Sequence, residues 1–202
     1  MTPLAGAQGA HDTVRMSETA SLKNQLLIAM PNLQDPNFSR TVTYICEHGE
    51  HGAMGIVLNR PTDLRLADVL RHMEIEGGLG AAGEQIVYLG GPVEEERGFV
   101  LHSHTAPWSS TLAINDDISI TTSRDILEAM ARGDGPDLTL VALGYAGWAA
   151  GQLEREMQDN AWLSGPADQS ILFELPAERR WEAAARLLGV DVNLLSSEAG
   201  HA

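Results

Sequence analysis

The sequence predicts an α+β fold, a single domain of bent, mostly antiparallel sheet with about four helices. Short β-branched or aromatic runs alternate with glycine, proline and Asx turns, which is typical of strands joined by hairpins. Four other segments repeat apolar residues at spacings of three and four, which is typical of amphipathic helices. The 202 residues contain no fixed-period repeat and no internal linker, so one domain is expected.

The N-terminal third carries the first three expected strands. Gln25–Met30 is an apolar run that stops at Pro31, and Thr41–His48 alternates β-branched and aromatic residues. Ala53–Asn59 is the third strand. Two glycines in the intervening segment 47–52 predict a hairpin, and therefore antiparallel pairing.

The first helix is expected at Leu66–Met73, with Asp63 as its cap and a glycine-rich loop, Gly77–Gly83, after it. Two further hairpins follow. The acidic segment 94–96 is expected at the tip of the first, and an Asn-Asp-Asp turn joins the strands of the second. Their four strands are Gln85–Leu89, Arg97–His102, Thr111–Ile114 and Ile118–Thr121.

The second helix begins near Arg124, where Thr122 and Asp125 match a capping box, and ends before the segment 133–136. Leu138–Leu143 is an apolar run that suits a buried strand. The glycine-spaced segment Gly144–Trp148 is then expected to form a corner that leads into a third helix.

The C-terminal part predicts a strand at Ser170–Glu174 and a last helix at Ala177–Leu188, which Gly189 ends. Residues 1–20 lack periodicity and are expected to be a disordered extension. The domain itself is expected to occupy residues 21–190, with a flexible tail at 191–202.

Charge argues against direct nucleic-acid binding. The chain has 13 basic and 28 acidic residues, a formal net charge of −15, and this field repels a phosphate backbone. Lys23 is the single lysine and the other basic residues are arginine, which binds planar anions in a bidentate manner. A GC-rich genome would produce the same arginine bias.

The sequence also predicts a cytoplasmic location without membrane contact. Cys46 is the one cysteine, as is usual in a reducing compartment. The first thirty residues show no secretory signal, and no apolar run approaches the length of a membrane span.

Six strings of the sequence resemble the signature segments of the AlgH-like family of bacterial proteins, also called YqgE. They run in family order from about Leu22 to Leu188 and are LLIAMPNLQDPNFSRTVTYICEH, GAMGIVLNRP, YLGGPV, RGFVLH, ISITTSRDILEAMARGDGP and LVALGYAGWAAGQLEREMQDNAWL. The resemblance implies a single α+β domain of bent, coiled sheets in a cytoplasmic bacterial protein. It also implies a family that is labelled as transcriptional regulators and has no established biochemical activity.

Soft metal ligands are the first candidates for chemistry. Cys46 and His48 share one face of a strand, as do His102 and His104, and His51 lies in a nearby loop. Their spacing matches no structural zinc signature, so no metal is expected, and Cys46, His48 and His102 remain weak candidates. No cofactor is expected either.

Nucleophilic catalysis is a weaker hypothesis. Cys46 and His48 could form a thiolate and base, but no local oxyanion donors accompany them. Ser123 and Asp125 resemble a serine–acid fragment, which helix capping explains better.

The glycine corner is a candidate ligand site without a reactive group. Gly144 and Gly147 could expose backbone N–H groups to an anion, or they could serve only close strand–helix packing. Tyr145 and Trp148 would then pack or border a pocket, joined by an arginine from another motif.

Four arginines lie at the ends of expected elements inside the family-like strings. They are Arg40, Arg60, which follows Asn59, Arg97 and Arg124. If two or three converge, they would bind a small anionic molecule or an acidic partner; if not, they pair internally and fix loops.

These observations predict a noncatalytic regulatory or ligand-binding protein that acts indirectly and not by binding DNA. The alternative is an enzyme that acts on a small anionic metabolite through an arginine-lined pocket. The partner, protein or small anion, is unspecified, and a homodimer is compatible with the exposed apolar strand faces.

Overall fold

The computed structural model describes residues 21–77, 80–103, 107–192 and 194. The expected N-terminal extension and His104 lie outside the described residues, as does most of the expected C-terminal tail. Val192 is buried against the main core, two residues beyond the expected end of the domain.

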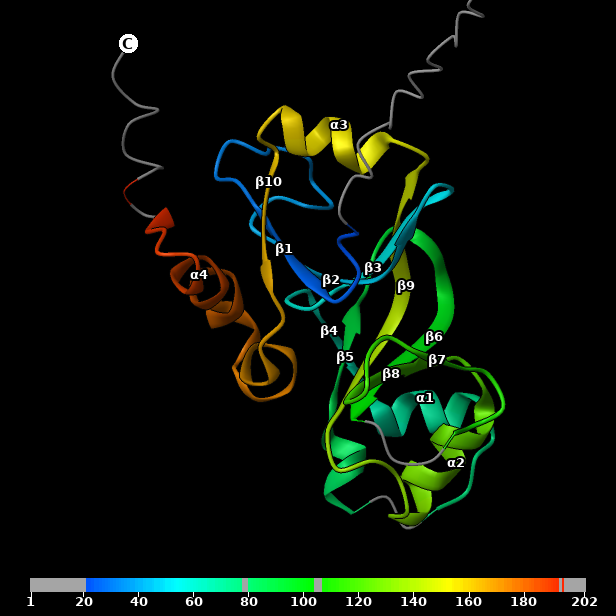
Figure 1. The fold of residues 1–202 in the computed structure, drawn as a ribbon. Helices are drawn as coiled ribbons and strands as arrows, with labels where there is room; N and C mark the ends of the chain where they lie inside the picture. The colour runs from blue at the N-terminus through cyan, green and yellow to red at the C-terminus, as the bar shows by residue number, and fades with distance from the viewer. Residues whose placement is uncertain (1–20, 78–79, 104–106, 193, 195–202) are drawn as a thin grey trace, which may run out of the picture.

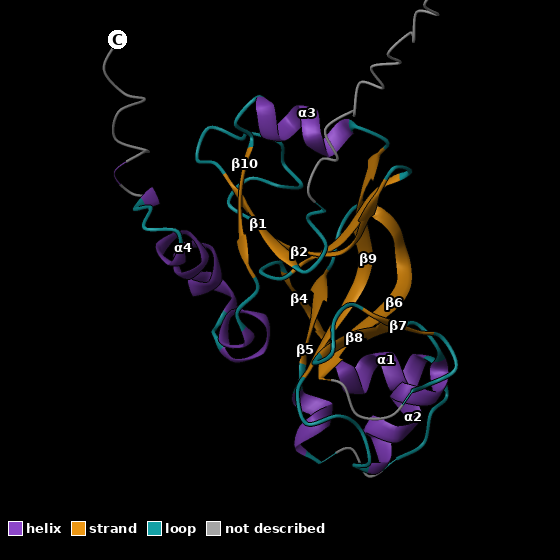
Figure 2. Ribbon diagram, in the orientation of Figure 1, coloured by secondary structure: helices purple, strands orange, loops and turns teal. Residues whose placement is uncertain are grey.

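Ten strands of the described chain form one coiled sheet, in the order β10-β1-β2-β3-β9-β6-β8-β7, with β4 and β5 branching from β9 (Figures 1 and 2). Every pairing is antiparallel except that of β5 with β9. The α+β class and the mostly antiparallel sheet are therefore confirmed. The strands are β1 (Gln25–Ala29), β2 (Val42–Gly49), β3 (Gly52–Val57), β4 (Pro61–Arg65), β5 (Ile86–Leu89), β6 (Val93–Ser103), β7 (Thr111–Ala113), β8 (Ile118–Thr121), β9 (Thr139–Ala149) and β10 (Trp162–Pro166).

Four α-helices of the described chain surround this sheet. Figure 1 shows α1 and α2 together at one end, α3 at the opposite end, and α4 beside β10. They are α1 (Leu66–His72), α2 (Arg124–Arg132), α3 (Gln152–Gln158) and α4 (Ala177–Leu187), with a short 3₁₀ helix η1 (Ala81–Glu84) and a π-helix η2 (Ser170–Glu174). None of these helices is both long and apolar enough to cross a membrane.

Strand β9 organises the sheet because it changes partner along its length. Its first half pairs with β5 on one side, its second half pairs with β3, and β6 runs along the other side. Gly144 lies between the halves with φ +72°. The expected strand-to-helix corner at Gly144–Trp148 is therefore wrong, because the strand continues to Ala149 and the helix begins at Gln152, after Gly151 in the left-handed region.

The hairpin expected between β5 and β6 is also wrong, because the chain crosses β9 between them. The N–H of Gly90 donates to the carbonyl of Leu143 at 2.7 Å, and β6 then pairs on the far side of β9. A Cβ on Gly91 would lie 2.1 Å from the carbonyl carbon of Tyr145. Only glycine allows two backbones to approach this closely.

Two local predictions fail for other physical reasons. Ser170–Glu174 is a π-helix and not a strand: the Leu175 N–H donates to the Ser170 carbonyl at 2.8 Å, and Asp168 accepts a hydrogen bond from the Ile171 N–H. Asp63 lies in β4, and α1 is capped instead by Asp68, whose carboxylate accepts the Arg65 N–H at 2.9 Å.

The β2–β3 and β7–β8 hairpins are confirmed, as are helices at all four expected positions. Strands β4 and β10 are absent from the sequence-based prediction. The expected capping box of Thr122 and Asp125 is wrong: α2 begins at Arg124 after Ser123, whose side chain makes no capping hydrogen bond and instead donates to Asp125 at 2.5 Å.

Alternation along β6 and β9 separates two parts of the core. Phe99, Leu101 and Ala142 face the main core, whereas Val100 and Val141 face a second core under α1 and α2. These two central strands therefore present different surfaces on their two faces.

Candidate functional site

The predicted convergence of arginines does not occur. Arg40 is exposed and stacks over the Trp181 ring at 5.3 Å, and its carbonyl accepts the Asn59 amide at 2.9 Å. Arg60 donates to the carbonyl of Ser39 at 2.5 Å. Arg40, Asn59 and Arg60 thus tie the segment before β2 to the end of β3, and they line neither of the clefts described below.

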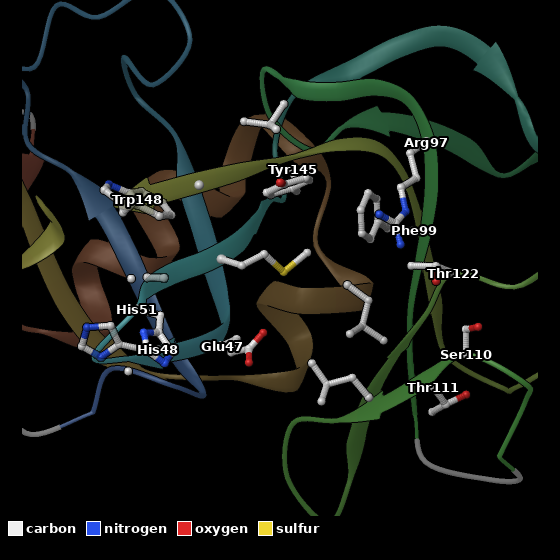
Figure 3. A pocket seen from close by; sticks show the side chains of 18 of the residues that line it. Glu47, His48, His51, Arg97, Phe99, Ser110, Thr111, Thr122, Tyr145 and Trp148 are labelled. Carbon is white, nitrogen blue, oxygen red and sulfur yellow. The ribbon is translucent and has the colours of Figure 1, made fainter. Parts of the chain in front are cut away.

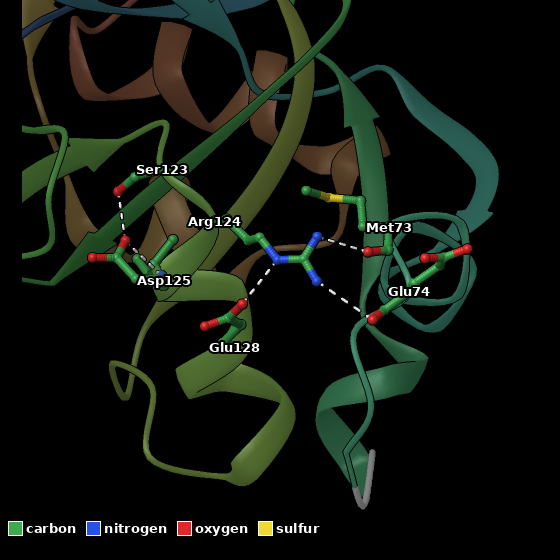
Figure 4. Close-up of polar contacts among 7 residues, drawn as sticks. Met73, Glu74, Ser123, Arg124, Asp125 and Glu128 are labelled. Carbon is green, nitrogen blue, oxygen red and sulfur yellow. Dashed lines mark hydrogen bonds and ion pairs between the residues drawn. The ribbon is translucent and has the colours of Figure 1, made fainter.

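Arg124 joins two helices. Its Nε donates to Glu128 at 2.8 Å, and its Nη1 and Nη2 donate to the carbonyls of Met73 and Glu74 at 2.7 and 3.4 Å (Figure 4). All three nitrogens of the guanidinium group thereby have partners. Arg124 consequently holds α2 against the end of α1.

A cleft of about 990 Å³, here called cleft A, opens on the main-core face of β6 and β9. Strand alternation directs Phe99 and Tyr145 to it, and their rings meet edge to face at 5.7 Å. Figure 3 shows the labelled side chains around this space. Its lining residues are Glu47, His48, Gly49, Glu50, His51, Gly52, Ala53, Met54, Val93, Arg97, Phe99, Ser109, Ser110, Thr111, Leu112, Ile120, Thr122, Tyr145, Gly147 and Trp148.

Cleft A combines an aromatic wall with a hydroxyl-rich wall. Tyr145, Gly147 and Trp148, three of the sequence candidates, lie in the aromatic wall on β9. The hydroxyl-rich wall lies around β7 and contains Ser109, Ser110 and Thr111. Both apolar contact and hydrogen bonding are thus available to one bound molecule. Gly144 does not line the cleft and serves the backbone crossing instead.

The charges of cleft A do not favour a strongly anionic ligand. Arg97 is the sole arginine in its wall; it stacks over Phe99 at 5.4 Å and forms a 3.0 Å ion pair with Glu94. Glu47 and Glu50 place two carboxylates in the same wall. A polyanion would meet more negative than positive charge here.

The histidine and thiol candidates contact different partners, and no hydrogen bond joins one of them to another among the described residues. The Leu22 N–H donates to Nδ1 of His48 at 2.8 Å, so the neutral ring carries its proton on Nε2, which donates to Glu154 at 2.9 Å. Cys46 is fully buried, and burial raises the pKa of its thiol far above the ordinary value. His102 is buried and bonded to Thr121.

These placements remove the local basis for a thiolate–imidazole pair. In the part of the chain that the structure describes, no three His, Cys, Asp or Glu side chains gather in a way that could hold a metal ion. His51 is almost fully exposed beside Glu50. At the start of α2, Asp125 accepts hydrogen bonds from the hydroxyl groups of Ser109 and Ser123.

A second cleft, here called cleft B, has a volume of about 720 Å³ and lies on the opposite face of β6 and β9, against α1 and α2. Val100, Val141 and Leu143 line it from the sheet. Its other lining residues are Leu64, Asp68, Val69, His72, Met73, Glu95, Glu96, Gly98, Phe99, Thr121, Thr122, Ser123, Arg124 and Leu127.

Neither the hydroxyl-rich wall nor cleft B is predictable from the sequence. Ser109, Ser110 and Thr111 precede and begin a short strand, and their composition is that of an ordinary loop. Met54 and Leu112 lie in strands, and nothing in their local sequence indicates a cleft. Only the pairing of distant strands brings these residues to one cleft, and no local pattern encodes that pairing.

The fold defines a single-domain α+β protein built on one coiled sheet, with a cleft on each face of its central strands. The chain belongs to the AlgH-like family, whose family model matches residues 26–193.

Close relatives support this assignment along nearly the whole chain. The chain is 61% identical over 187 residues to a UPF0301 protein of Thioalkalivibrio sulfidiphilus, covering 93% of this chain and 100% of the relative. The solution structure of the AlgH protein from Pseudomonas aeruginosa is 51% identical, with a TM-score of 0.74 over 93% of this chain and 100% of that one. A Corynebacterium diphtheriae protein shares the fold at 20% identity, with a TM-score of 0.68 over 85% and 89% of the two chains.

Proposed function

We propose that this chain is a noncatalytic, cytoplasmic ligand-binding protein with a regulatory role, and that its ligand lies in cleft A. The observation that carries the proposal is the wall of cleft A, where Tyr145 and Phe99 form an aromatic surface and Ser110 and Thr111 add hydroxyl groups. A volume of about 990 Å³ is sufficient for a small molecule.

The ligand that suits this wall is a planar, hydrogen-bonding molecule without a high negative charge. An aromatic surface favours a flat ring, and hydroxyl groups bind polar substituents. Glu47 and Glu50 disfavour the anionic ligand that the arginine pattern suggests. The enzyme alternative needs two or more guanidinium groups on one anion, whereas Arg40, Arg97 and Arg124 occupy three different places.

Regulation without direct DNA contact agrees with the net charge of −15. In this account the bound ligand, or a protein partner, carries the regulatory signal. A fluorescence anisotropy titration with promoter-length duplex at physiological salt is expected to show no saturable binding. Submicromolar, sequence-specific binding would contradict the indirect role.

A thermal-shift screen tests the ligand site. It compares nucleobases, nucleosides and aromatic amides with the corresponding nucleotides, and the uncharged compounds are expected to raise the unfolding temperature more. Gly147→Leu places a side chain in cleft A and should abolish the shift, whereas Gly98→Leu in cleft B should not. An equal shift in both variants, or none with any uncharged compound, would contradict the proposal.

A further inference from the structure

Cleft B has the features of a second ligand site. Val100, Val141 and Leu127 form its buried floor, while Val69 and Leu143 are only partly buried although they pack against the same core. The cleft therefore leaves apolar surface uncovered between α1 and the sheet. Its volume of about 720 Å³ lies within the range of small-molecule sites.

The space in cleft B arises from a bulge in β6. Val93 pairs with Tyr145 and Gly98 pairs with Leu143, so the segment 94–97 has no partner on β9. Gly98 faces the cleft, on the same side of the strand as Val100, and a Cβ built there would have no atom within 4 Å. The site is open at this position because glycine occupies it.

The charges at the mouth of cleft B select the ligand. Arg124 lies there, but its guanidinium nitrogens already bind Glu128 and two carbonyls of the α1 end. Glu95 and Glu96 also line the cleft; both are exposed, and their carboxylates form no hydrogen bond or ion pair with any residue that the structure describes. The unpaired charge at the mouth is thus negative.

We propose that cleft B binds a small molecule with an apolar body and one cationic group, such as an aliphatic amine. The apolar body lies among Val69, Leu127 and Leu143, and the ammonium group lies near Glu95 and Glu96. An anionic amphiphile such as a fatty acid would meet two free carboxylates and an arginine that already pairs with Glu128. This site lies on the opposite face of the sheet from cleft A and does not depend on the function proposed for it.

Three probes of equal length test the proposal: n-hexylammonium, n-hexanol and n-hexanoate, each titrated into the ¹⁵N-labelled protein and followed by amide chemical shifts. Hexylammonium should bind at least about threefold more tightly than hexanol, as expected for a surface charge pair, and hexanoate should bind most weakly. The shifts should centre on Val69, Leu127 and Leu143.

Variants separate the apolar contact from the charge. Gly98→Leu fills the cleft from β6 and should abolish binding of all three probes; Val69→Phe fills it from α1 and gives a second route if the first variant does not fold. In the double variant Glu95→Gln/Glu96→Gln, hexylammonium and hexanol should bind with equal affinity. Glu174→Gln, an exposed charge change on η2, should leave the preference intact.

Three results would overturn the proposal. The first is hexanoate binding as tightly as hexylammonium. The second is a set of shifts centred on Met54 and Tyr145 in cleft A. The third is the absence of shifts for all three probes up to their solubility limits.

Discussion

The indole N–H of Trp148 donates a 2.9 Å hydrogen bond to the carboxylate of Glu156. The same oxygen accepts the indole N–H of Trp162 at 2.9 Å, and the two rings meet edge to face with centroids 6.0 Å apart. Glu156 lies on α3, so one carboxylate fixes a tryptophan of cleft A and a tryptophan of β10 to the same helix.

Replacing Glu156 by alanine should destabilise the protein by about 2 kcal/mol, because two largely buried indole N–H groups lose their acceptor. Glu156→Gln keeps a carbonyl oxygen and should cost less. Urea unfolding provides the measurement. Glu182→Ala on α4 removes only an exposed pair with Arg186 and serves as the control, at about 0.5 kcal/mol or less. Equal losses for Glu156→Ala and Glu182→Ala would contradict the assignment.

Arg180 is a structural residue of the core. It is only 3% exposed, its Nη1 donates to the carbonyl of Leu58 at 2.5 Å, and its Nε donates to that of Leu175 at 2.9 Å. Burial lowers its pKa, yet the carbonyls and the Tyr88 ring, 5.1 Å away, accommodate the charge.

Arg180→Ala should cost about 3 kcal/mol, since it leaves two carbonyls without their donor and opens a cavity. Its neighbour Arg179 is exposed, so Arg179→Ala should change the free energy of unfolding by less than about 0.5 kcal/mol. Chemical denaturation of both variants checks the difference. If Arg180→Ala were as stable as Arg179→Ala, the buried hydrogen bonds of Arg180 would make no net contribution to the free energy of unfolding.

The crossing of β9 should not tolerate a side chain. Gly91→Ala forces a Cβ against the backbone of Tyr145, at a position with φ +154°, and should cost about 3 kcal/mol or prevent folding. Gly49→Ala, where a Cβ would meet no atom within 4 Å, should be nearly neutral. Thermal unfolding of the two variants provides the comparison, and a neutral Gly91→Ala would show that the crossing can relax.

Asp125 should contribute a pH-dependent share of stability. Burial raises its pKa, but hydrogen bonds from Ser123, Ser109 and the Ile126 N–H outweigh burial, so the net pKa lies below 3.8. A folded pKa below the unfolded one stabilises the protein above the unfolded pKa, and this share is lost as the pH falls through the folded pKa.

The measured quantity is the stability difference between the unmodified chain and Asp125→Asn. It should be constant near neutral pH and shrink as the pH falls below about 4. The exposed Asp116→Asn serves as a control for the loss of one negative charge. If the stability difference for Asp125→Asn stayed the same from about pH 7 to strongly acidic pH, this assignment would be contradicted.

Local physics predicted most elements of this fold. Apolar residues that repeat every two positions located β2 and β3, and those that repeat every three or four positions located α2 and α4. The Asn-Asp-Asp turn between β7 and β8 was also correctly predicted. Long-range pairing was not predictable in the same way. Gly90, Gly91 and Gly144 suggested turns, but they serve a crossing between segments more than 50 residues apart, which no local pattern distinguishes from a hairpin.

The candidate site was predictable only in part. Tyr145, Gly147 and Trp148 lie in the wall of cleft A, as does Arg97, because β9 and β6 run side by side. The other arginines were chosen for their position at element ends. Such ends are also where guanidinium groups bind free carbonyls, as Arg60 and Arg124 do.

A crystal structure of the protein with the uncharged ring compound that gives the largest increase in unfolding temperature tests the ligand site directly. We expect electron density for the ring against Tyr145 and Phe99 in cleft A, with polar atoms near Ser110 or Thr111. Density for the compound at any other place, with cleft A unchanged, would contradict this expectation.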